Sequence, residues 1–74
     1  MCRYKLYEVG GDWDVKKGVL LSKHFTKKGV EKRLFNEANK RIKHVYYYVR
    51  TELTPKITII DYGSYTRFLA IQRR

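Results

Sequence analysis

Residues 26–42, TKKGVEKRLFNEANKRI, contain the pattern that decides the fold class of this chain. Apolar side chains recur there every four residues, at Val30, Leu34, Ala38 and Ile42. This spacing places them on one face of a helix, and Phe35 widens the apolar stripe. Thr26 comes just before the stripe and is a candidate N-cap, because its hydroxyl can accept a hydrogen bond from the first turn. The pattern predicts an amphipathic helix of about four turns.

The residues on both sides of this helix alternate between apolar and polar side chains, as strands do. The predicted strands are residues 3–9, 15–25, 44–53, 56–61 and 65–71, with residues 72–74 as a frayed tail. Turn signals lie between them at Gly10-Gly11-Asp12, Thr54-Pro55 and Asp61–Ser64, and Gly18 predicts a bulge. The predicted class is α+β, a small antiparallel sheet of order β-β-α-β-β-β with the helix packed on one face.

The size of the chain limits how it can be stabilised. Its 74 residues form a single domain, 1–74, near the lower limit for a hydrophobic core. One cysteine allows no intrachain disulfide and no zinc site. Small chains often gain stability by association, so a homodimer is expected. No apolar run approaches the roughly 20 residues of a membrane helix, and no signal peptide is present, so a soluble cytoplasmic protein is expected.

The charge of the chain is its strongest global feature. Lys and Arg number 17 against 7 Asp and Glu, for a net charge of +10. This surplus favours an anionic partner, either nucleic acid or an acidic protein surface, although solubility alone also explains it.

The candidate reactive side chains do not form a catalytic pattern. The two histidines have no metal-ligand spacing, and the paired aspartates lie at the tip of a loop. Nothing nearby activates the single thiol. These residues are His24, His44, Asp12, Asp14 and Cys2. We therefore predict no enzyme activity, no metal site and no cofactor.

The first candidate binding surface is the outer face of the sheet, around HVYYYVR at residues 44–50. If the odd-numbered residues from Val45 to Leu53 face the helix, the even-numbered ones face outward. The outward set would be Tyr46, Tyr48 and Arg50, joined by Lys5, Tyr7 and Arg67. Two interpretations remain open: tyrosines that stack unpaired bases, or tyrosines that cover the sheet or a dimer interface.

The second candidate surface is the basic side of the helix. It would neutralise phosphates through Lys27, Lys28, Lys32 and Lys40, with further lysines at 16, 17 and 23. Lys27 and Lys28 oppose the helix dipole at the N-terminal end, which favours a surface role for them. A solvated charged face is the alternative.

The third candidate surface is the loop around Trp13. Glu8, Asp12 and Asp14 surround this tryptophan at a predicted hairpin tip. Tryptophan is enriched at interface hot spots, and clustered acids do not suit a nucleic-acid site, so the loop favours a protein partner. The alternative is that Trp13 folds back onto the sheet.

The size, the Lys- and Tyr-rich composition and the segment IIDYGSYTRFLAI at 59–71 resemble small early proteins of lytic phages. Within that group the chain is similar to the sliding-clamp inhibitors of Twort-like staphylococcal phages. The resemblance implies a dimeric phage protein that binds a host protein in the host cytoplasm, such as the DNA-replication sliding clamp, and blocks nucleic-acid processing by occupancy.

Two sets of site residues follow from these surfaces. For a protein partner they are Asp12, Trp13, Asp14, Tyr46, Tyr48 and Arg50. For the alternative function, a small basic nucleic-acid-binding module, they are Lys27, Lys28, Lys32, Lys40, Tyr46 and Tyr48.

Overall fold

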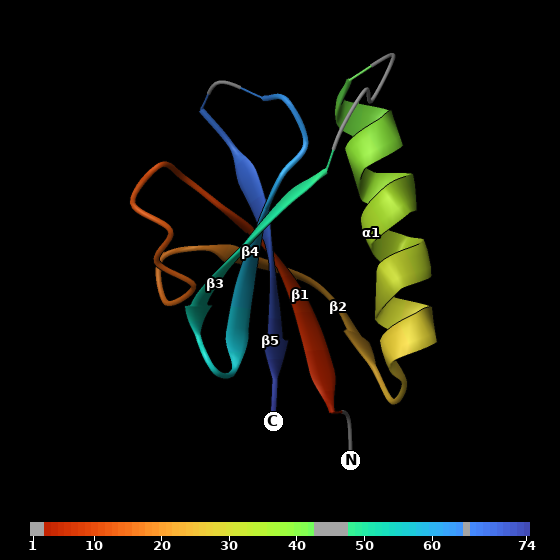
Figure 1. The fold of residues 1–74 in the computed structure, drawn as a ribbon. Helices are drawn as coiled ribbons and strands as arrows, with labels where there is room; N and C mark the ends of the chain where they lie inside the picture. The colour runs from red at the N-terminus through yellow and green to blue at the C-terminus, as the bar shows by residue number, and fades with distance from the viewer. Residues whose placement is uncertain (1–2, 43–47, 65) are drawn as a thin grey trace.

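A computed structural model describes residues 3–42, 48–64 and 66–74 of the chain. It contains a five-stranded antiparallel sheet and one helix (Figure 1). The elements are β1 Tyr4–Val9, β2 Val19–His24, α1 Lys27–Arg41, β3 Val49–Thr54, β4 Ile57–Asp61 and β5 Phe68–Arg73. The strand order is β2-β1-β5-β4-β3, so the first and last strands of the chain lie next to each other in the sheet. The predicted class and element order are confirmed.

The helix forms where the four-residue period predicts it. The Thr26 hydroxyl accepts a hydrogen bond from the Gly29 N–H at 3.0 Å and caps the first turn. Val30, Leu34 and Ala38 are fully buried. The helix contacts β1, β2 and β5, and so covers one half of one face of the sheet.

Each face of the sheet has its own apolar cluster, because side chains alternate along every strand. The helix-side cluster contains Leu6, Ile60, Tyr62, Leu69 and Ile71 together with the buried helix residues. The second-face cluster contains Val9, Ile59 and Ala70, with Tyr7, Trp13, Val15, Ile57 and Phe68 packed against it. Both faces of this small sheet therefore contribute to the core.

The predicted second strand, residues 15–25, was too long, since β2 begins only at Val19. Residues 15–17 form a turn, in which the Lys17 N–H donates to the Asp14 carbonyl at 3.1 Å. The bulge is not at Gly18: the register between β1 and β2 shifts between Leu6 and Tyr7. Gly18 instead allows a close approach, because a Cβ there would lie 2.7 Å from the Glu8 carbonyl oxygen.

The predicted faces of β3 were inverted. Arg50 pairs with Ile60, which belongs to the helix-side cluster, so Arg50 lies on the helix side of the sheet. Val49 and Thr51 lie on the second face, and all six residues of this edge strand are exposed. Val45, Tyr46 and Tyr47 lie outside the described residues.

The predicted last strand started too early and its tail was wrongly expected to fray. β5 extends to Arg73, whose N–H donates to the Lys56 carbonyl at 2.7 Å. The Arg74 N–H donates to the Arg3 carbonyl at 2.8 Å. Before β5, Asp61 accepts from the Gly63 N–H at 3.0 Å and starts a loop in which Gly63 has a positive φ of 103°.

Candidate binding surfaces

Trp13 packs onto the second face of the sheet. Its ring lies 5.6 Å from the ring of Phe68 at an interplanar angle of 77°, and it contacts the second-face cluster. Its φ of 56° is in the left-handed region, which is unusual for a bulky residue. Of the two interpretations of this tryptophan, folding back onto the sheet is the one that agrees with the geometry. Trp13 is only partly available to a partner.

The carboxylates beside Trp13 hold the loop in shape. Asp12 Oδ1 accepts from the Asp14 N–H at 3.2 Å, and Asp14 Oδ1 accepts from the Lys16 N–H at 2.9 Å. Such bonds of Asp to the backbone two residues on stabilise turns. A structural role thus accounts for both aspartates, and their contact with a partner stays a prediction.

Tyr48 and Arg50 lie beside the helix and not on the open face where they were expected. The Tyr48 ring lies 4.8 Å from the ring of Phe35 in an edge-to-face contact, and burial raises the pKa of its hydroxyl. Arg50 makes a bidentate ion pair with Glu31 of α1. These contacts tie the edge strand to the helix, and Tyr48 is not a free stacking platform. Tyr46 lies outside the described residues.

Basic side chains gather at one end of the molecule, which we call the basic end. β1 starts there, β2 and β5 end there, and α1 begins beside them (Figure 1). The antiparallel register brings together positions that are distant in the chain, because Tyr4 pairs with both His24 and Arg73. The exposed cations at this end include Arg3, Lys23, Lys27, Lys28, Lys56 and Arg73.

The side chain of Arg73 is oriented at this end by the β3–β4 turn. Its Nε donates to the Pro55 carbonyl at 3.0 Å, and this bond does not use the terminal N–H groups of the guanidinium. The acids nearest to the basic end in the sheet and the helix are Glu52 and Glu31.

The structure brings together only part of the predicted lysine set. Lys27 and Lys28 belong to the basic end, and Lys32 follows one turn along α1. Lys40 is near the other end of the helix, where its Nζ lies 3.6 Å from Glu37. The sequence prediction missed Arg3, Lys56 and Arg73, because only the pairing of β1, β4 and β5 places them side by side.

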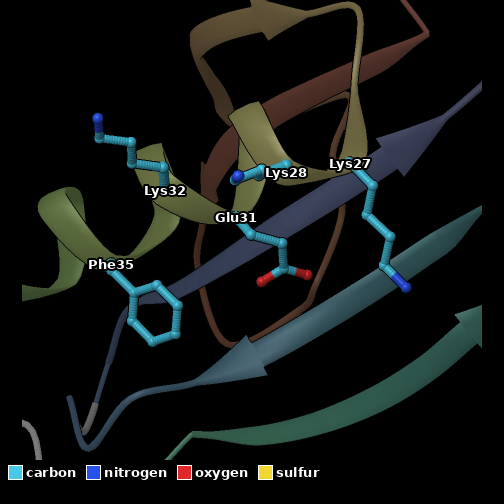
Figure 2. A pocket seen from close by; sticks show the side chains of 5 residues that line it. All are labelled: Lys27, Lys28, Glu31, Lys32 and Phe35. Carbon is cyan, nitrogen blue, oxygen red and sulfur yellow. The ribbon is translucent and has the colours of Figure 1, made fainter.

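A shallow, mostly apolar hollow lies on the helix surface next to the basic end (Figure 2). The Phe35 ring and the Glu31 carboxylate point to the same side, whereas the Lys32 ammonium points away from them. Lys27, Lys28, Glu31, Lys32 and Phe35 line it. Phe35 is 43% exposed, which is high for a phenylalanine next to a core.

A buried carboxylate lies near the C-terminal end of α1. Glu37 is 6% exposed, and its carboxylate accepts a hydrogen bond from Arg41, as the i,i+4 spacing predicts. Arg41 also donates to Glu8 of β1 at 2.6 Å. Burial alone would raise the pKa of Glu37, but the bond from Arg41 and the charges of Lys40, Arg41 and Arg33 lower it. The i,i+4 spacing brings Glu37 and Arg41 together locally, whereas the burial of Glu37 and the link to Glu8 come from the packing of α1 on β1.

The described residues offer no arrangement for a metal ion, since no three His, Cys, Asp or Glu side chains come together there. The His24 ring is within 2.8 Å of the Ser22 hydroxyl, with no carboxylate bonded to it. Cys2 and His44 lie outside the described residues. In the part of the chain that the structure describes, no helix has the length and apolarity to cross a membrane.

Comparison of the chain with protein-family models, with curated proteins and with solved structures finds no match.

Proposed function

We propose that this chain is a non-enzymatic, phage-type binding protein that attaches to a host protein, such as the replication sliding clamp, and blocks nucleic-acid processing by occupancy. The supporting observation is the set of large apolar side chains left exposed. Six of them are between 42% and 69% exposed: Val19, Leu20, Phe25, Phe35, Val49 and Leu53.

These side chains suit a protein partner better than a nucleic acid. Phosphate groups gain nothing from contact with valine or leucine, whereas apolar and aromatic side chains form the centre of protein interfaces. Phe25 directly follows the edge strand β2 at the basic end, whereas Val19 and Leu20 lie at the start of the same strand, away from that end. Phe25 beside the cations of the basic end suits a partner whose surface combines apolar and acidic residues.

The basic end supports a second candidate function, a small nucleic-acid-binding module. The exposed cations named above come from five separate segments of the chain and lie at one end. Such a surface would bind phosphates without reading sequence. Base stacking by Tyr48 would be weak, because that ring already packs against Phe35.

Matched variants distinguish the two functions. Phe25→Ser should weaken capture of a bacterial sliding clamp and leave nucleic-acid binding unchanged if the first function is right. Lys27→Gln with Lys28→Gln should weaken binding to DNA or RNA if the second is right. Lys16→Gln with Lys17→Gln is the control, because it removes the same charge at the opposite end of β2.

The first measurement is equilibrium binding of labelled single- and double-stranded DNA and RNA at about 50 and 200 mM salt. Binding to the clamp is measured at the same two salt concentrations. Tight, salt-sensitive binding to nucleic acid without any binding to the clamp would contradict the first function. Clamp binding that survives Phe25→Ser would show that this apolar surface is not the contact.

A further inference from the structure

β3 is an edge strand of the sheet, with a register shift between Glu52 and Thr54 but without the proline or lysine that often protects such an edge. Its sequence VRTELT contains no proline and no lysine, and all six residues are exposed. An edge strand presents unpaired N–H and C=O groups, which can pair with another strand. The helix packs on β1, β2 and β5, the half of the sheet away from β3, so it leaves the backbone of this edge open (Figure 1).

We propose that β3 pairs antiparallel with β3 of a second copy of this chain, about a two-fold axis that passes through Thr51. In this register Arg50 of each copy lies opposite Glu52 of the other, and Thr51 lies opposite itself. Residues directly opposite each other share a face of the sheet, so both Arg50–Glu52 pairs form on the helix side. This inference does not rest on the proposed function.

The charges of β3 favour this register over registers with the two-fold axis at a neighbouring residue. A two-fold axis at Arg50 would place arginine opposite arginine, and one at Glu52 would place glutamate opposite glutamate. A register shifted by only one residue would set the two faces of the strand against each other, which a regular antiparallel pair does not allow. Opposite charges across a strand pair are stabilising and like charges are destabilising, so the axis at Thr51 is favoured.

The local contacts leave these side chains available for the pairing. The side chain of Glu52 has no hydrogen bond or ion pair with the described residues. Arg50 bonds Glu31 through its two terminal nitrogens, which leaves guanidinium donors for a second carboxylate. Glu31, Arg50 and Glu52 of the second copy would then form a continuous row of alternating charge.

The other free edge lacks this complementarity. The β2 sequence VLLSKH contains no acid, and Lys16, Lys17 and Lys23 add positive charge along it. A chain of net charge +10 repels its own copy, so self-association needs a segment whose own charges balance. β3 is such a segment, and pairing would also cover part of Val49 and Leu53, which are 50% and 45% exposed.

The first test is site-specific cross-linking in a Cys2→Ser background. Thr51→Cys would place two cysteines directly opposite each other on the axis, at a separation that a disulfide can bridge. We expect oxidation to give a cross-linked dimer at least about ten-fold faster than for Thr66→Cys, whose residue is also exposed but lies in the β4–β5 loop. Equal rates for the two variants would overturn the proposal.

The second test is charge reversal with complementation, measured by sedimentation. Glu52→Arg and Arg50→Glu should each raise the dimer Kd about ten-fold or more, because each replaces two attractive contacts with repulsive ones. An equimolar mixture of the two variants should form a heterodimer, because every glutamate again faces an arginine. Circular dichroism checks that Arg50→Glu, which also loses the bond to Glu31, keeps the fold.

Pairing of two edge strands buries only a small interface, so we expect a weak dimer. Sedimentation of the unmodified chain at about 10 and 200 μM gives its dimer Kd, to which the variants are compared. A monomer at both concentrations would overturn the proposal. So would a dimer that neither charge variant weakens, or a mixture of the variants that stays monomeric.

Discussion

At the scale of single residues, Trp13 shows how packing can outweigh backbone strain. Its φ of 56° costs a non-glycine residue about 1–2 kcal/mol. The ring recovers more than this by packing against Phe68 and the second-face cluster. The conformation therefore follows from the side chain, although the backbone at this position favours glycine.

This balance predicts an unusual order of stabilities. Trp13→Ala and Trp13→Gly both lose the ring, but glycine alone accepts the left-handed backbone without strain. We expect the Gly variant to be about 1 kcal/mol more stable than the Ala variant, the reverse of the usual order. Urea unfolding of both variants measures the difference, and an Ala variant of equal or greater stability would show that position 13 is not strained.

The buried Glu37 makes the stability of the fold depend on pH. Its pKa in the folded chain is below the ordinary 4.5, because Arg41 and the neighbouring cations outweigh the effect of burial. A carboxylate with a lowered folded pKa contributes stability above its unfolded pKa. That contribution is lost as the pH falls through the folded pKa.

We therefore expect Glu37→Gln to cost about 2 kcal/mol at neutral pH and progressively less below about pH 4.5. Free energies of unfolding between pH 7 and pH 3 check this. Glu52→Gln, at low protein concentration, is the control, since Glu52 is exposed and has no partner among the described residues. Parallel curves for the Glu37 variant and the unmodified chain would exclude the ion pair as the cause of acid sensitivity.

At the scale of elements, α1 combines good burial with a poor charge at its first turn. No acid lies in that turn, and Lys27 and Lys28 are both exposed there. The helix dipole makes positive charge unfavourable at this end by about 0.3–1 kcal/mol per residue. Lys27 and Lys28 therefore destabilise the helix. A role in binding an anionic partner would explain why both cations are in this turn.

Lys28→Glu should accordingly stabilise the fold by about 0.5 kcal/mol while it weakens binding to an anionic partner. Thermal unfolding and nucleic-acid binding on the same sample test both effects. Lys16→Glu is the matched control, because this charge reversal lies outside any helix. If Lys28→Glu leaves all binding unchanged, Lys28 is only a solvated surface residue.

At the scale of the whole molecule, the antiparallel topology separates charge between the two ends of the sheet. The strands bring Arg3, Lys56 and Arg73 together with the start of α1, while the loop of Asp12 and Asp14 follows the far end of β1. Such an asymmetric charge distribution orients an approaching anionic surface toward one end of the molecule.

The sequence by itself determined the helix and the number of strands. The four-residue period of Val30, Leu34 and Ala38 and the cap at Thr26 are local features, set by backbone geometry within a few residues. The α+β class followed from the same local patterns. The start of β2 was less predictable, because the apolar Val15 continues the alternation although Asp14 has already turned the chain.

Only the tertiary structure decided which face of β3 meets the helix, where Trp13 lies and which cations form the basic end. A period of two defines two faces but does not say which one is buried, and Arg50 lies on the helix side because β3 pairs with β4 in one register. Arg3 and Arg73 are at opposite ends of the chain and meet because β1 pairs with β5. The physical reason is that periodicity is set by neighbouring residues, whereas strand order and burial are set by pairing between segments far apart in the sequence.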